Sequence, residues 1–225
     1  MNRRYIFPFL FGLIGAGILV SLGVWQLHRL QWKEAMLADI TARIAAAPVP
    51  LPAHPDPSHD EYLAVTAKGE VQPHELHVLT STEDTGPGYR VISVFVTAEG
   101  RRVMVDRGFV PEAGAAAPRD GFATTLVGNL QWPNETDSFT PAPDLKDDIW
   151  FARDVAKMAA ALKTEPVLIV AKDMPGESAA ISPVPVDTSG IRNDHLNYAI
   201  TWFSLAFCWL GMTGLLLWRI RRKQV

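Results

Sequence analysis

Hydrophobic positions concentrate in two long runs, one near each end of the chain. Residues 5–27 and residues 196–218 contain no charged side chain, and each run has 23 residues. As an α-helix, such a run is about 35 Å long, at about 1.5 Å per residue. This length is sufficient to cross a hydrocarbon core of about 30 Å. The pattern therefore predicts two transmembrane helices.

The residues between the two runs predict a folded domain over residues 28–195. Helix-forming residues continue without a breaker over residues 28–47, and a proline-rich connector follows over residues 48–61. Segments rich in β-branched residues then predict strands over residues 62–71, 76–80, 91–97, 102–110, 124–132 and 167–171. A loop over residues 175–185 leads to the second hydrophobic run.

Two local patterns in this domain are particularly clear. Glu99 and Gly100 supply a turn between the third and fourth predicted strands, which indicates a hairpin. Residues 154–163 predict a helix, because its apolar residues share one face: Val155, Met158, Ala159 and Leu162. The fold class is therefore a membrane α+β protein. Two terminal transmembrane helices flank a mostly antiparallel, β-rich extramembrane domain, for which a barrel-like sheet is one arrangement.

Basic residues predict the orientation of the chain in the membrane. Arg3 and Arg4 precede the first run, and the segment after the second run adds Arg219, Arg221, Arg222 and Lys223. Cytoplasmic flanks of membrane helices are enriched in Lys and Arg, so residues 1–27 read as a cytoplasmic tail with the first span and residues 219–225 as a basic cytoplasmic tail. Residues 28–195 hold the other 15 of the 21 Lys and Arg residues and all 24 acidic residues, a net charge of −9. This charge argues against nucleic acid as a partner.

The first run is longer than the apolar core of a signal peptide, which favours an uncleaved anchor. No Arg-rich and Ser-rich transit peptide precedes it, and this favours a bacterial inner membrane with a periplasmic main domain. The single cysteine, Cys208, lies in the second run, so neither a disulfide within the chain nor a paired-cysteine copper or zinc site is possible. Gly211 and Gly214 in that run would allow close packing against another helix.

His195 is the leading functional candidate, because it stands at the head of the second run. An ionisable side chain at that boundary is costly, and imidazole is a common ligand of haem iron. On a helix, Tyr198, Ala199 and Trp202 share the face of His195, and this face could accept the edge of a porphyrin. The alternative interpretation is a histidine that binds lipid headgroups or backbone groups at the membrane surface.

Basic residues near the same boundary are candidates for contact with haem propionates. Arg29 follows the first run, and Arg192 precedes His195 by three residues; Lys33 is a weaker candidate. The alternative is an ordinary boundary of tryptophans and extended basic side chains, since Trp25 and Trp32 flank Arg29.

Other histidines have less support as ligands. His28 could be a second axial ligand or simply a residue at headgroup level. His74 and His77 resemble half of a metal site, but they would point to opposite faces of a strand. The sequence carries no GxSxG, HExxH or phosphate-loop motif, so we expect no enzymatic activity.

Three segments together resemble the Surfeit locus protein 1 family of cytochrome c oxidase assembly factors. They are residues 23–33 (GVWQLHRLQWK), residues 87–111 with PGYRV at the start and VDRGFVP at the end, and residues 192–203 (RNDHLNYAITWF). Their order and their placement around one domain also match. Phe109 departs from the family pattern, in which tryptophan is usual.

The resemblance implies a role in building haem-copper oxidases, by holding haem a for insertion into the catalytic subunit. It implies that His195 ligates the haem iron and that Trp202 takes part in binding, with the oxidase catalytic subunit, the haem a synthesis machinery and the lipid bilayer as partners. We expect Tyr198 to pack on the ring, Arg29 and Arg192 to meet the propionates, and Arg107 and Gly108 to shape a hairpin that caps the site. The rival is a haem-free membrane scaffold that holds oxidase subunits together. A copper chaperone is a third idea, against which the lack of paired cysteines counts.

Overall fold

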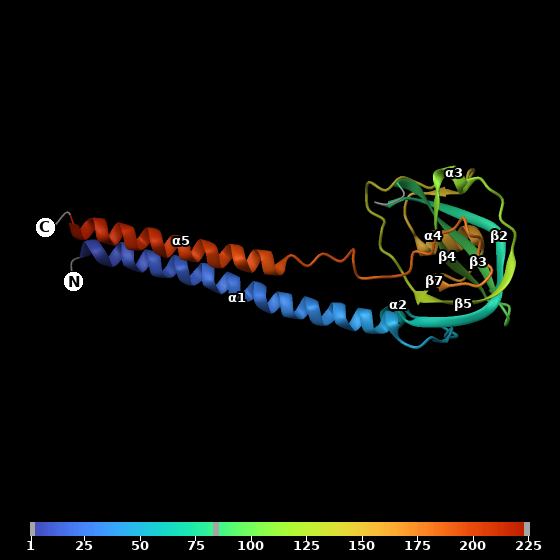
Figure 1. Cartoon of the computed structure of the whole chain (residues 1–225), viewed down its shortest axis with the longest axis horizontal. Helices are drawn as coiled ribbons and strands as arrows, with labels where there is room; N and C mark the ends of the chain where they lie inside the picture. The colour runs from blue at the N-terminus through green and yellow to red at the C-terminus, as the bar shows by residue number, and fades with distance from the viewer. Residues whose placement is uncertain (1–2, 83–85, 223–225) are drawn as a thin grey trace. The chain divides into compact units, whose positions relative to one another are not determined.

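The computed structural model describes residues 3–82 and 86–222 of the chain (Figure 1). It divides into two compact units. One contains the residues up to Asp39 together with those from Thr188 onward, and the other contains Ile40–Asp187. The first unit is helical and the second holds the whole sheet, so each is described by itself.

Two long helices make up the helical unit. Helix α1 spans Arg3–Ala45, so that its last turns belong to the sheet unit, and helix α5 spans His195–Arg222. They run antiparallel and side by side (Figure 1), because Gly23 of α1 faces Phe203 of α5 while Gly15 faces Trp209. Both helices are long and apolar enough to cross a membrane. Two such helices flanking a sheet-rich domain agree with the sequence prediction.

The helices of this unit touch through small residues of α1. A Cβ atom added at Gly15 would lie 2.5 Å from the Trp209 indole nitrogen, and one at Gly23 would lie 2.7 Å from the Phe203 ring. Ala16, Ala199 and Ala206 are buried in the same contact. Gly211 and Gly214 lie outside this contact, because a Cβ at either position would meet only open space, and their packing against another helix stays a prediction.

The sheet unit contains strands β1 to β7 and three short helices. The strands are β1 (Val49–Pro50), β2 (Ala64–Thr82), β3 (Gly86–Thr97), β4 (Arg102–Pro111), β5 (Phe122–Leu130), β6 (Ile149–Trp150) and β7 (Leu168–Asp173). The helices are α2 (Pro57–Asp60), α3 (Glu112–Ala115) and α4 (Val155–Leu162).

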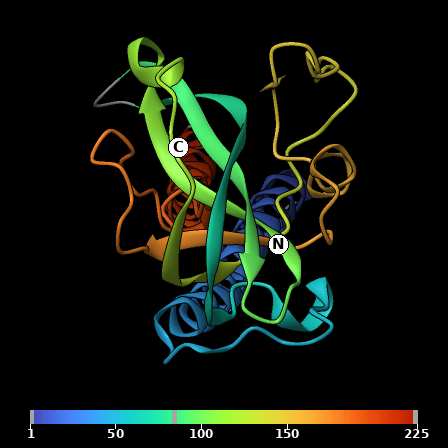
Figure 2. The ribbon, with the colours of Figure 1, turned by 90° about the vertical axis from the view of Figure 1, so that its right-hand side faces the viewer.

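Five of the strands pair into a ring. Their order is β2-β3-β4-β7-β5, and β5 pairs back onto β2. All of these pairings are antiparallel except that of β4 with β7. Figure 2 shows the strands wrapping around a common interior. The ring-like sheet is therefore mostly antiparallel, as its hydrophobic pattern predicts.

Alternate residues of the strands fill two cores. One core takes side chains from every strand of the ring, for example Val71, Phe95, Val105, Leu126 and Ile169, and so lies inside it. The other lies between the sheet and α4, where Met104 and Leu168 meet the four apolar residues predicted to share a helix face. That prediction is confirmed.

Local signals explain the boundaries of the predicted elements. The Asp154 carboxylate accepts a hydrogen bond from the Lys157 backbone N–H at the start of α4, and Lys163 ends the helix in the left-handed conformation. Gly100 has a φ of +81° in the turn between β3 and β4, which confirms the predicted hairpin. The two strands expected over residues 62–80 are instead one strand, β2, with an irregularity between Val71 and Glu75.

Candidate functional site

His195 begins α5, and its imidazole meets a glutamine of α1. The distance between His195 Nδ1 and Gln26 Oε1 is 2.8 Å. Gln26 is 8% exposed, although its neighbours Trp25 and His28 are exposed. The two residues lie 169 positions apart in the chain, so this contact exists only because α1 and α5 pack together.

The other aromatic residues proposed for the site lie along α5. Trp202 is half-buried, while Tyr198 is 56% exposed. Ala199 lies one turn after His195, is 1% exposed and belongs to the helix contact. The residues predicted to share one face of α5 therefore have different surroundings. Ala199 packs against α1, whereas Tyr198 is exposed.

The predicted propionate-binding arginines make other contacts. The Arg29 guanidinium lies over the Trp32 ring, 4.3 Å from its centroid, one turn along α1 from Gln26. Arg192 donates to the Asp194 carboxylate at 2.8 Å, with its side chain 88% exposed. The structure brings His195 together with Gln26. Both arginines are exposed, Arg29 three residues after Gln26 and Arg192 three residues before His195.

His28 faces away from this pair. It follows Gln26 by two residues, which is a rotation of about 200° around a helix of 3.6 residues per turn. Gln26 is buried against α5 whereas His28 is exposed. A role as second axial ligand on the face of His195 is therefore disfavoured.

The sheet unit has its own buried polar residues, centred on Asp106 and Arg107 of β4. Asp106 is completely buried and accepts from the Arg90 guanidinium at 2.7 Å and from the Arg153 guanidinium at 3.4 Å. The Gly108 backbone N–H donates to its other oxygen at 3.2 Å. Both oxygens of this buried carboxylate thus accept hydrogen bonds.

Arg107 is the extra residue of a β-bulge, because its neighbours pair with Ile92 and Val91. Its side chain is 1% exposed and donates two hydrogen bonds to Glu177, at 2.6 and 2.8 Å. A third hydrogen bond, at 3.2 Å, reaches Glu75, which Arg119 also contacts. Sequence reasoning missed this cluster, since its members come from four separate segments.

The pKa is lowered for two carboxylates, Glu75 beside Arg107 and Glu135, which pairs with Arg153. Burial raises the pKa of Glu75, but the His77 hydrogen bond and the charges of Arg119 and Arg107 outweigh it, so the pKa is lowered. In Glu135, burial again raises the pKa and the contacts with Arg153 outweigh it. Both clusters are balanced networks of ion pairs, and their role is to hold the fold.

Contacts with β3 and β4 fix residues 177–184, which precede α5 in the chain, on the sheet. Arg107 binds Glu177, the Arg90 guanidinium donates to the Val184 carbonyl at 3.0 Å, and Phe109 forms a bridge with Ser182. Gly108, with a φ of +124°, approaches the Ser182 carbonyl so closely that a Cβ would lie 2.2 Å from it. Arg107 and Gly108 therefore shape β4, and the expected capping of the site by this hairpin stays a prediction.

The remaining histidine pair does not form a metal site. His74 contacts Asp148 at 3.2 Å, whereas His77 contacts Glu75 at 3.0 Å. Over the residues that the structure describes, no group of three or more His, Cys, Asp or Glu side chains could hold a metal ion.

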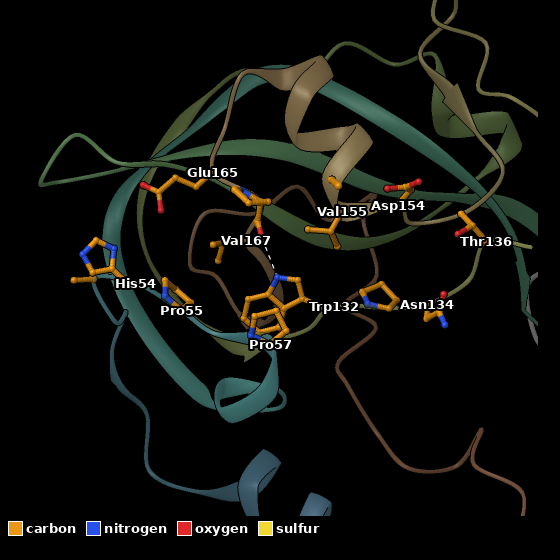
Figure 3. A pocket seen from close by; sticks show the side chains of 14 residues that line it. His54, Pro55, Pro57, Trp132, Asn134, Thr136, Asp154, Val155, Glu165 and Val167 are labelled. Carbon is orange, nitrogen blue, oxygen red and sulfur yellow. Dashed lines mark hydrogen bonds between the residues drawn. The ribbon is translucent and has the colours of Figure 1, made fainter.

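The sheet unit also contains a cavity of about 560 Å³ (Figure 3). Its lining includes His54, Trp132 and several prolines, and the Trp132 indole donates to the Pro166 carbonyl at 2.9 Å. Its two carboxylates are already used, because Glu165 pairs with Arg101 and Asp154 caps α4. Neither of these carboxylates is therefore free to bind a cationic ligand in the cavity.

Comparison with known proteins identifies the family of this chain. Residues 13–207 match the SURF1 family. A SURF1-like protein of Monosiga brevicollis is 31% identical over 87% of this chain and 82% of its own length. A SURF1-like protein of Rickettsia felis is 31% identical over 86% of this chain and 89% of its own. The Surfeit locus protein 1 of Homo sapiens is 30% identical over 83% of this chain and 69% of its own length. The chain belongs to the SURF1 family.

Proposed function

We propose that this protein is an assembly factor for haem-copper cytochrome c oxidase. It binds haem a and aids its insertion into the catalytic subunit, and it does no bond-making chemistry itself. Haem a is its cargo, received from the haem a synthesis machinery. Family membership and the placement of His195 together support this function.

The contact between His195 and Gln26 is the observation that carries the proposal. A metal ligand must offer an unprotonated imidazole nitrogen, and a hydrogen bond at one ring nitrogen leaves the other available. The glutamine occupies Nδ1, so Nε2 is the nitrogen that would ligate the haem iron. The donor set at this position thus fits haem.

The surrounding side chains suit the rest of the cargo. Trp202 and Tyr198 would pack on the porphyrin, and Arg29 and Arg192 would meet its propionates. The contacts that these arginines make with Trp32 and Asp194 are at exposed positions, where such interactions are worth at most about 1 kcal/mol. A carboxylate of the cargo could therefore replace them. A single histidine ligand also suits a carrier that must release what it holds.

The setting of the proposed site is a membrane surface. We place α1 and α5 across a bacterial inner membrane, with both termini in the cytoplasm and the sheet unit in the periplasm. The length and apolarity of the helices support the spans, and the basic residues at their outer ends support the orientation. His195 would then lie at the periplasmic boundary.

An optical redox spectrum tests the proposal. The full chain is purified in detergent after co-expression with haem a synthesis enzymes, as wild type and as His195→Ala. We expect a haem a band in the wild type and its loss in the variant. His59→Ala, which removes an exposed histidine of the sheet unit, is the matched control and should keep the band.

Two other outcomes have distinct meanings. A band that survives in His195→Ala would place the ligand elsewhere and make His28→Ala the next variant. A wild type without haem that still co-purifies with the oxidase catalytic subunit, equally well in His195→Ala, would overturn the carrier function in favour of the scaffold.

A further inference from the structure

Gln26 is a buried amide in the contact between α1 and α5, which is made mainly of small and apolar side chains. The residue one turn before it, Gly23, lies directly against Phe203, and Ala199 one turn after His195 is 1% exposed. The polar pair therefore stands at the end of the tightest part of the helix contact. A buried amide at such a place is costly unless it is hydrogen-bonded, and its oxygen has a partner in His195.

The chemistry of this pair selects one form of the imidazole ring. An amide oxygen only accepts hydrogen bonds. At 2.8 Å from that oxygen, His195 Nδ1 must therefore carry the proton. A neutral imidazole has a single ring proton, so Nε2 keeps its lone pair.

We propose that Gln26 is the positioning residue of the haem site and holds His195 in the tautomer whose Nε2 can ligate iron. The role in haem binding rests on the proposed function, whereas the tautomer of His195 rests only on its contact with Gln26. The packing of α1 against α5 fixes the glutamine, and the glutamine fixes the ring. The haem site would thus depend on a residue of α1 that does not touch the cargo.

The tautomer can be measured without haem, by nitrogen NMR of the full chain in detergent micelles with ¹⁵N-labelled histidine. The His195→Ala spectrum assigns the signals of His195 among the six histidines. For the neutral ring of the wild type, we expect Nδ1 at the frequency of a protonated nitrogen and Nε2 at that of an unprotonated one. The opposite pattern would mean that the amide nitrogen faces the ring, and it would overturn the proposal.

Two substitutions of Gln26 separate positioning from packing. Gln26→Leu removes the acceptor and should abolish the tautomer preference, whereas Gln26→Glu keeps an oxygen acceptor and should restore it. Gln31→Leu, an exposed glutamine of the same helix, is the matched control and should match the wild type. An unchanged spectrum in Gln26→Leu would refute the role of Gln26.

Haem binding provides the second readout. Loss of a residue that orients a metal ligand typically weakens metal affinity about 10- to 100-fold, and we expect a loss of this size for haem a in Gln26→Leu. In Gln26→Glu we expect a lower midpoint potential than in the wild type, because a carboxylate makes the imidazole a stronger donor. If the tautomer results hold but the wild type binds no haem a, the proposed function fails while the effect of Gln26 on the His195 tautomer stands. If haem a binds equally well to the wild type and to both Gln26 variants, the proposed function stands and the positioning role of Gln26 fails.

Discussion

At the scale of single residues, Arg107 shows what a buried charge demands of its surroundings. Its guanidinium is almost fully buried and forms ion pairs with both Glu177 and Glu75. Removing one partner of a buried ion pair leaves the others uncompensated, which costs about 3–5 kcal/mol. The stability of the sheet unit therefore depends on Arg107 more than on any surface charge.

We expect Arg107→Met to lower the free energy of unfolding of the sheet unit by about 3–5 kcal/mol. Hydrogen exchange of the β4 amides, followed by mass spectrometry, measures this change. Lys172→Met removes an equal charge from an exposed position of β7 and serves as the control. Equal exchange rates in the two variants would contradict the structural role of the Arg107 cluster.

Glu75 predicts a dependence of stability on pH. Its pKa in the folded state lies below the ordinary value of about 4.5. It therefore adds stability above that value, and this stability is lost as the pH falls through the folded pKa. Protection of the β2 amides should decline below about pH 4.5, and the decline should be shallower in Glu75→Gln. Glu70→Gln, on the exposed face of the same strand, should decline as the wild type does.

At the scale of elements, the contact between α1 and α5 depends on the absence of side chains. We expect Gly23→Val to lower the stability of the helix pair by about 1–3 kcal/mol, because its side chain would overlap the Phe203 ring. Thermal unfolding in detergent, followed by the helical circular dichroism signal, measures this. Gly17→Val places the same side chain in open space on the same helix, so a similar loss in both variants would refute the packing argument.

The elements themselves were largely predictable from the sequence. The long helices, the hairpin around Gly100 and the buried face of α4 follow from local periodicity and turn chemistry. The continuity of β2 does not, because Gln72, Pro73 and His74 break the alternation while the strand continues past them. The short pieces β1, β6, α2 and α3 are too brief to have a period.

The candidate site was predictable only in part, for a related reason. His195 stands out because it is an ionisable residue at the edge of an apolar run. Gln26 does not, since its importance comes from a partner 169 residues away. A usable signal was present nonetheless: Gly12, Ala16, Gly23 and Gln26 recur at helical spacing, which places the glutamine on the small-residue face of α1.

At the scale of the whole molecule, the proposed topology predicts which positions a reagent can reach. In a Cys208→Ser background, we expect Lys172→Cys to react with a membrane-impermeant maleimide in cells whose outer membrane is permeabilised. Arg222→Cys should react only after the inner membrane is disrupted. Both residues are exposed in the structure, so the difference reports the side of the membrane. The reverse pattern would invert the orientation.

The ring of strands has a consequence for the order of events during synthesis. β7 is the last strand made, and it lies between β4 and β5. Until the ribosome has produced residues 168–173, each of those two strands keeps one edge of unpaired backbone groups, which is a template for aggregation. Closing the ring also joins segments far apart in the chain, and such contacts form slowly. The nascent sheet thus passes through an open, vulnerable stage, and it can close only shortly before α5 is made.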